Sequence, residues 1–198
     1  MIQLVLPERL SLGPRFVVPA IEVALFVTLV IANPNRLNEE SKDLRIVSLG
    51  LIGVISAADA SALVLLIAQL VKASGTLEGS TLIFAAVGIW TTNVVAFGIW
   101  YWEIDRGGPI RRCLREHPAP DFLFTQMDHP EVSRGPWSPM FVDYLYLSLT
   151  NSTAFSPTDT LPLSRRAKLL MALQAVASLA TIAVLAARGV NILRSGSG

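Results

Sequence analysis

The chain has 198 residues, of which 52% are hydrophobic and only 16% are charged, and its mean hydropathy is +0.53. So little charge seldom covers the surface of a soluble domain of this size, so the composition favours an integral membrane protein. A net charge of +1 with no basic arm argues against a nucleic-acid partner.

Two apolar segments come first along the chain. The segment 16–32, FVVPAIEVALFVTLVIA, stops before Asn33 and Pro34, and the segment 46–71 is rich in glycine, alanine and serine. Both approach or exceed the roughly 20 helical residues that cross a hydrocarbon core. The N-terminus lacks the cleavage region of a signal peptide, so we expect the first segment to be retained as a span.

Each of these two segments contains one acidic residue. Asp59 lies in mid-span, where a charge is costly, and two interpretations of it stay open. It is either a functional group or a hydrogen-bonded acid between closely packed helices. Glu22 lies nearer the end of its span, where it could reach water, and is expected to be structural.

The third apolar segment, 81–102, ends in an aromatic run that contains Trp100, Tyr101 and Trp102. Because tryptophan and tyrosine gather at headgroup boundaries, we expect this run to form an interfacial belt. Asn93, inside the same segment, is expected to join helices rather than bind a ligand.

A charged segment and a short helix follow. Residues 103–137 are rich in proline and glycine, and predict an extramembrane loop with one amphipathic turn at 110–116. Ser138 is a good N-cap and Pro139 suits a first helical position, so a helix is predicted over 139–150.

The apolar run of this short helix has about half the length of a membrane crossing, which fits a re-entrant helix better than a span. Asp143, one turn into it, is expected to interact with the positive end of the helix dipole. A polar return follows the helix, formed by Asn151, Ser152, Thr153, Ala154, Phe155, Ser156, Pro157, Thr158 and Asp159. Non-helical backbone at membrane depth must be buried in protein or line a wet cavity, so we expect this return to line a pore on an axis between subunits.

The fourth apolar segment is 169–190, and it contains the polar residues Gln174 and Ser178. Gln174 is expected to join helices. The segment follows the basic residues Arg165, Arg166 and Lys168. Arg165 and Arg166 are the candidates for the mouth of a pore, where they would raise the local concentration of anions.

The residues from Tyr146 to Val190 resemble, without a gap, the pore-helix, filter and inner-helix segment of potassium channels of the two-transmembrane pore type. That family's filter reads Thr-Val-Gly-Tyr-Gly-Asp and is followed by a proline, and its aspartate and proline align with Asp159 and Pro162. Gln174 takes the place of the usual glutamate, and Ser178 that of the gating glycine. Further matching positions are Ser164, Ala167, Lys168, Leu170, Leu173, Ala175, Ala183, Leu185, Ala187 and Arg188.

The whole chain is also similar to small actinobacterial membrane proteins that carry a comparable AFSPTDT segment.

The filter segment departs from the potassium-channel pattern. Ser156 and Thr158 replace both filter glycines, and Pro157 replaces the filter tyrosine. The potassium filter points carbonyls at the ion with backbone angles that glycine adopts freely, so a potassium-type filter is not expected. Any selectivity would come from side-chain hydroxyls and amides of the return, or from Asp159, Arg165 and Arg166.

The membrane orientation has two alternatives. The resemblance implies that the half-helix and filter face outward and that both termini lie inside. The positive-inside rule favours the reverse, with 36–45 and 103–168 in the cytoplasm.

The sequence thus predicts an all-α integral membrane protein of a bacterial plasma membrane, with four transmembrane helices and a re-entrant pore half-helix before the last one. Residues 1–75 would form two N-terminal transmembrane helices and 76–194 a pore-like module, and 195–198 have the composition of a cloning scar. The resemblance implies a channel-like homotetramer in the lipid bilayer that conducts inorganic ions passively, non-selectively or as an anion channel.

The alternative function is a structural or partner-binding membrane protein that keeps the pore scaffold without conduction, with Phe155 and Pro157 as a plug. An enzyme is not expected, because no nucleophile and base pair is apparent. Cys113, His117 and His129 fit no metal-ligand spacing, and no cofactor is expected.

Overall fold

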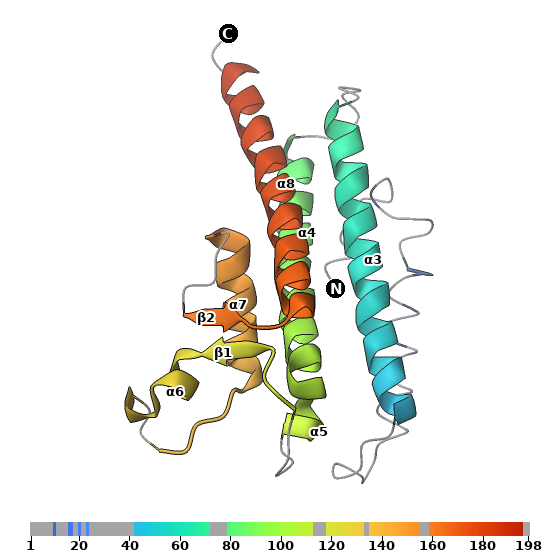
Figure 1. Ribbon diagram of the computed structural model, residues 1–198. Helices are drawn as coiled ribbons and strands as arrows, with labels where there is room; N and C mark the ends of the chain where they lie inside the picture. Colours follow the sequence, from blue (N-terminus) through green and yellow to red (C-terminus); the bar gives the residue numbers. More distant parts are fainter. Residues whose placement is uncertain are drawn as a thin grey trace.

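The computed structural model in Figure 1 contains three long helices that run side by side. They are α3 (Lys42–Val71), α4 (Gly79–Ile104) and α8 (Arg165–Ser195). The structure describes Leu10, Phe16, Val17, Ala20, Val23 and the ranges 42–71, 79–112, 118–132, 135–154 and 159–195.

Each long helix has a stretch that is long and apolar enough to cross a membrane. These stretches are Arg45–Gln69, Ser80–Gly107 and Arg165–Ala187, with mean hydropathies of 2.3, 1.9 and 2.2. The structure therefore confirms a predominantly helical chain, with three helices long and apolar enough to be the second, third and fourth predicted spans. Most of the first predicted span, 16–32, lies outside the described residues.

The helices begin earlier than their apolar cores suggest. α8 starts at Arg165, four residues before the predicted 169, because the Ser164 hydroxyl accepts a hydrogen bond of 3.2 Å from the Ala167 N–H. This bond satisfies one of the free N–H groups of the first turn. Hydropathy alone places the boundary too late, since charged residues continue a helix beyond the hydrocarbon core.

A shorter helix, α7 (Phe141–Thr153), packs against α4 and α8. The predicted cap at Ser138 and Pro139 is wrong, because the cap residue is Met140. The Met140 N–H donates to the Asp143 carboxylate at 2.7 Å, and the Asp143 N–H donates to the Met140 carbonyl at 3.0 Å. Asp143 therefore has the structural role at the helix start that its position predicted.

The segment between α4 and α7 is not a simple loop. Its elements are η2 (Asp105–Gly107), α5 (Pro109–Arg112), β1 (Phe122–Phe124), α6 (Thr125–Asp128) and η3 (Pro130–Val132). Only the start of the predicted turn at 110–116 falls in α5, and 113–117 lie outside the described residues.

β1 pairs antiparallel with β2 (Thr160–Pro162), with Leu123 opposite Leu161. This small sheet corrects the all-helical expectation. Phe122 and Phe124, on one face of β1, are buried against the Tyr144 ring of α7 at centroid distances of 6.3 and 5.3 Å. Burial of these two rings holds the strand against the helices.

The aromatic run at the end of α4 packs partly inside the protein, with Tyr101 buried and Trp100 and Trp102 half-buried. Tyr101 is fully buried, and its ring lies edge-on to Phe122 at 5.2 Å. The Trp100 indole donates to the Ser56 hydroxyl of α3 at 2.9 Å. Trp102 packs edge-on against Tyr144 at 5.5 Å. A local aromatic pattern cannot distinguish a lipid boundary from a protein one.

Candidate functional site: the polar end of the short helix

The last turn of α7 lies beside the third turn of α8. Asn151 of α7 donates to the Met171 carbonyl of α8 at 3.0 Å and to the Gln174 side chain at 2.9 Å. Gln174 is nine residues into the 31-residue α8, about 14 Å along its axis. The polar end of α7 therefore lies beside the first third of α8 (Figure 1).

Gln174 is the centre of a buried network. Its Oε1 accepts from the Tyr101 hydroxyl of α4 at 2.6 Å as well as from Asn151. Its Nε2 donates to the Ser148 hydroxyl at 2.6 Å and to the Ser148 carbonyl at 3.0 Å. The Ser148 hydroxyl in turn donates to the Val94 carbonyl at 2.6 Å. One carboxamide therefore joins α4, α7 and α8.

The predicted pore-lining residues fall into three groups. Asn151 and Ser152 are buried inside the protomer, where the Ser152 hydroxyl donates to the Leu149 carbonyl at 2.9 Å. Thr153, Ala154 and Asp159 are exposed. Phe155, Ser156, Pro157 and Thr158 lie outside the described residues.

A second polar cluster lies one turn further along α8. The Ser178 hydroxyl donates to Asn93 Oδ1 of α4 at 3.3 Å, and Asn93 hydrogen-bonds the Asp59 side chain of α3. Asn93 and Ser178 are buried. The predicted intramembrane residues Asp59 and Ser178 are thus brought together through Asn93, while Gln174 belongs to the neighbouring network.

The predicted mouth residue Arg166 is engaged in an ion pair. Its Nε and Nη2 donate to the two carboxylate oxygens of Asp121 at 2.7 and 2.6 Å. The Arg106 N–H also donates to Asp121, at 3.1 Å. Burial acts to raise the pKa of Asp121, but the hydrogen bonds and the Arg166 charge outweigh it and hold that pKa below its usual range. Arg165, the other mouth residue, is exposed.

A further cluster fixes the end of α4, and the sequence did not predict it. Asp105, fully buried, accepts from the Tyr144 hydroxyl at 2.6 Å and from the Asp121 N–H at 2.8 Å. The Arg112 Nη1 lies 3.5 Å from Asp105 and donates to the Tyr144 oxygen at 2.7 Å. The Arg112 guanidinium lies 4.1 Å from the centroid of the Trp102 ring. These contacts tie α4, α5 and α7 together.

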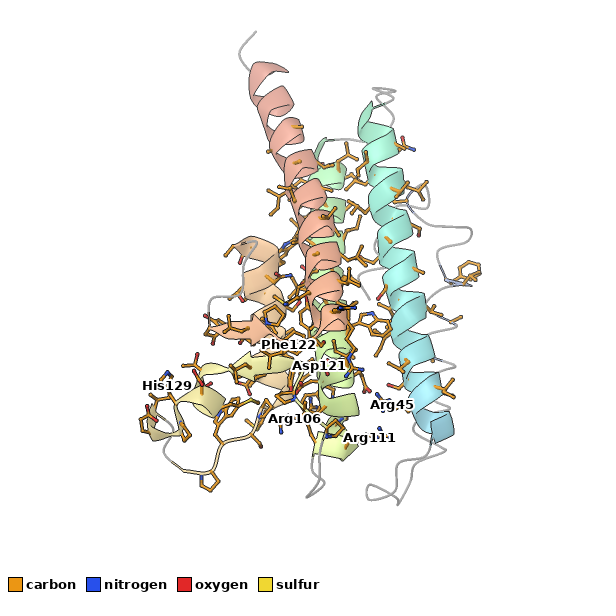
Figure 2. All side chains as sticks on the ribbon, viewed as in Figure 1. Arg45, Arg106, Arg111, Asp121, Phe122 and His129 are labelled. Carbon is orange, nitrogen blue, oxygen red and sulfur yellow. The ribbon has the colours of Figure 1, made fainter. Side chains whose placement is uncertain are left out.

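The feature of the sequence that could have predicted this cluster is the glycine pair Gly107 and Gly108, which is typical of a turn. Gly107 and Gly108 have φ angles of 83° and 110°, which glycine adopts without strain. The turn returns the chain toward α4, so that Arg112 reaches Asp105. Figure 2 shows Arg106, Asp121 and Phe122 close together at this end of the bundle, with His129 apart from them.

The site offers amides, hydroxyls and carboxylates. Among the described residues, no group of three or more histidine, cysteine or acidic side chains is placed to hold a metal ion. The arrangement can position helices and hold polar groups at the buried end of α7. Comparison of the chain with protein-family profiles, with curated proteins and with solved structures found no match.

Proposed function

We propose that this chain is a subunit of an ion-conducting membrane protein, assembled as a homotetramer in a bacterial plasma membrane, with a filter that is not of the potassium type. The observation that carries the proposal is the polar end of α7, held about 14 Å along α8 by the hydrogen bond between Asn151 and Gln174. α7 has 13 residues, so it is roughly 20 Å long and stops short of a full crossing. A helix of this kind, followed by a polar return, is what a re-entrant pore element requires.

The exposed surface near this end supports an assembly of several copies. Thr153 and Ala154 are exposed where the helix ends, and irregular backbone at that depth cannot face lipid. On the same chain, the α8 side chains Leu169, Leu173 and Val176 are 72%, 61% and 66% exposed. Neighbouring copies around a wet axis would cover both features. The number of four copies follows from the resemblance to potassium channels.

The charges of the residues around the polar return bear on which ions would pass. Asp159 is exposed, whereas the charge of Arg166 is balanced by Asp121. Arg165 and Lys168 are exposed at the start of α8 and would attract anions. Non-selective and anion conduction both agree with this balance, and potassium selectivity does not.

A second candidate is a non-conducting scaffold that binds a membrane partner. The observation in its favour is that Asn151 and Ser152 are buried and hydrogen-bonded within the protomer. These side chains hold helices together and are not free to replace the hydration shell of an ion.

Ion flux in liposomes distinguishes the two candidates. We would reconstitute the wild type and compare gradients of potassium, sodium and chloride. Asp159→Asn changes the charge of the exposed return, and Asp128→Asn is the matched control, because Asp128 is also exposed but lies in α6. If the protein conducts ions, the wild type should carry flux. The order of permeability among potassium, sodium and chloride should then change in Asp159→Asn and not in Asp128→Asn.

If Phe155 and Pro157 plug the pore, a different pattern of ion flux is expected. The wild type would then carry no flux, and Phe155→Ala would leak. Silence in the wild type and in Phe155→Ala would reject conduction and support the scaffold.

A further inference from the structure

Two arginines from different helices converge at the end of α4. A Cβ at Gly107 would lie 3.6 Å from the Nη1 atom of Arg111, in α5, and 3.7 Å from the Nη1 atom of Arg45, in α3. Both guanidinium groups therefore lie beside one backbone position (Figure 2). Because like charges repel, an anion bound beside them would stabilise this arrangement.

Glu103 supplies one negative charge at this place. A Cβ at Gly108 would lie 3.7 Å from Glu103 Oε2 and 3.8 Å from Arg45 Cζ, so this carboxylate lies near the Arg45 guanidinium. A single carboxylate balances only one of the two guanidinium charges. Each guanidinium has five N–H donors, so contacts within the protein still leave donors for the oxygen atoms of a further anion.

The arginine pair lies at the level where two apolar stretches end. Arg45 is the first residue of the stretch Arg45–Gln69, and Gly107 is the last residue of the stretch Ser80–Gly107. The headgroups of lipids lie just outside the hydrocarbon core that such stretches cross. Arg111 is exposed and Arg45 is half-buried, so both are accessible from the headgroup layer.

An uncovered apolar face of α3 begins next to Arg45. Ile46 and Val64 are 67% and 64% exposed. Gly50 and Ala57 are exposed as well and precede Val64 by two and one heptads, so these residues lie along one side of the helix. A basic pair at the boundary with an apolar face beneath it matches an amphiphile that has an anionic head and an acyl chain.

We propose that Arg45 and Arg111 bind the phosphate of an anionic phospholipid, and that an acyl chain of this lipid lies on the exposed face of α3. Guanidinium donates two parallel hydrogen bonds to phosphate oxygens, so two such groups can hold one phosphate from two sides. Basic pockets between transmembrane helices bind headgroups of this kind. The headgroup of a zwitterionic lipid would bring its own cation toward the arginines and bind more weakly. This site does not require the chain to conduct ions.

Native mass spectrometry of the full chain in a neutral detergent tests the proposal, with lipid added in increasing amounts. Phosphatidylglycerol should bind about tenfold more tightly than phosphatidylcholine with the same acyl chains. Arg45→Gln and Arg111→Gln should each lower the affinity for phosphatidylglycerol about tenfold, because each removes a charge-assisted contact to the phosphate. Lys168→Gln is the matched control, since it removes the same charge from an exposed position of α8, and should change this affinity by less than about twofold.

Three results would overturn the proposal. Equal affinity for the two lipids would show that the headgroup charge is not recognised. An equal loss in Lys168→Gln would show a general attraction to the basic end of the bundle. Competition by inorganic phosphate at the same concentration as phosphatidylglycerol would show a site for free anions and not for a lipid.

A photoreactive lipid gives a second readout on the wild type, which does not require any variant to fold. Phosphatidylglycerol with a diazirine in its acyl chain would be mixed as a minor component into phosphatidylcholine vesicles that contain the full chain. Peptides from 46–64 of α3 should be labelled more strongly than peptides around Leu173 of α8, although Leu173 is also 61% exposed. Equal labelling of the two helices would overturn the proposal.

Discussion

At the scale of single residues, Gln174 explains how α7 is held. Its carboxamide accepts from Tyr101 and Asn151 and donates to Ser148, so that both ends of the amide are satisfied without a charge. The sequence predicted that Gln174 joins helices, and the structure confirms this. Its partners could not be predicted, because they lie between 23 and 73 residues away along the chain.

Gln174→Leu should destabilise the protein by about 1–3 kcal/mol, because the Tyr101 hydroxyl and the Ser148 hydroxyl would lose a buried partner. Thermal unfolding in nanodiscs measures the loss. Thr91→Val is the matched control, since the Thr91 hydroxyl bonds to the Val87 carbonyl of its own helix, and should change stability by less than about 0.5 kcal/mol. Equal effects of the two substitutions would show that the network contributes little.

Asp121 should make stability depend on pH in the acidic range. Its pKa in the folded state is held below the usual aspartate value of 3.8, so its contribution is present at neutral pH. That contribution is lost as the pH falls through the folded pKa. The wild type should therefore become less stable below about pH 4, and Asp121→Asn should lack this part of the acid dependence. Arg166→Gln should lose it as well, and the double variant should lose no more.

At the scale of elements, hydropathy predicted the existence of the long helices and of α7, but not their boundaries. α7 starts at Phe141 rather than 139, because Asp143 and not Ser138 closes its first turn. The β1–β2 pair was missed because each strand has only three residues and the partners are 38 residues apart. Such a pairing leaves no periodic signal in either segment.

The contact between α7 and α4 depends on Gly98. A Cβ at this position would lie 3.2 Å from Leu145 Cδ1 and 3.3 Å from the backbone Cα of Leu145. Gly98→Ala should therefore cost about 1–2 kcal/mol, since the backbone of α7 would have to shift. Gly50→Ala is the matched control, because a Cβ there meets no atom within 4 Å. It should be neutral or stabilise α3 by up to about 1 kcal/mol, and a similar loss in both variants would contradict a close contact at Gly98.

At the scale of the whole molecule, basic residues gather at one end of the bundle. The end where α4 stops and α8 begins contains Arg45, Arg106, Arg111, Arg112, Arg165, Arg166 and Lys168. Arg45 of α3 belongs to this end, because a Cβ at Gly107 would lie 3.7 Å from its Nη1. Figure 2 shows Arg45, Arg106 and Arg111 there together. Toward the other end, α8 contains Arg188 and Arg194.

We expect the basic end to face the cytoplasm, as the positive-inside rule requires, opposite to the orientation implied by the resemblance. Single cysteines introduced into a Cys113→Ser background test this. Ser80 and Ser138 are both exposed and lie toward opposite ends of the bundle. A membrane-impermeant thiol reagent should label Ser80→Cys in intact cells, and Ser138→Cys only after permeabilisation. The reverse pattern would support the family orientation.

The pairing of β1 with β2 has a consequence for how such a chain could arise. The segment from 125 to 159 leaves the sheet at Phe124 and returns to it at Thr160, its direct partner. Paired residues on neighbouring strands lie about 5 Å apart, so the departure and return points almost coincide. A stretch with adjoining ends can be acquired or lost in one genetic event while the connection between the flanking helices keeps its course. A single insertion into a simple two-helix hairpin is thus sufficient to add α7.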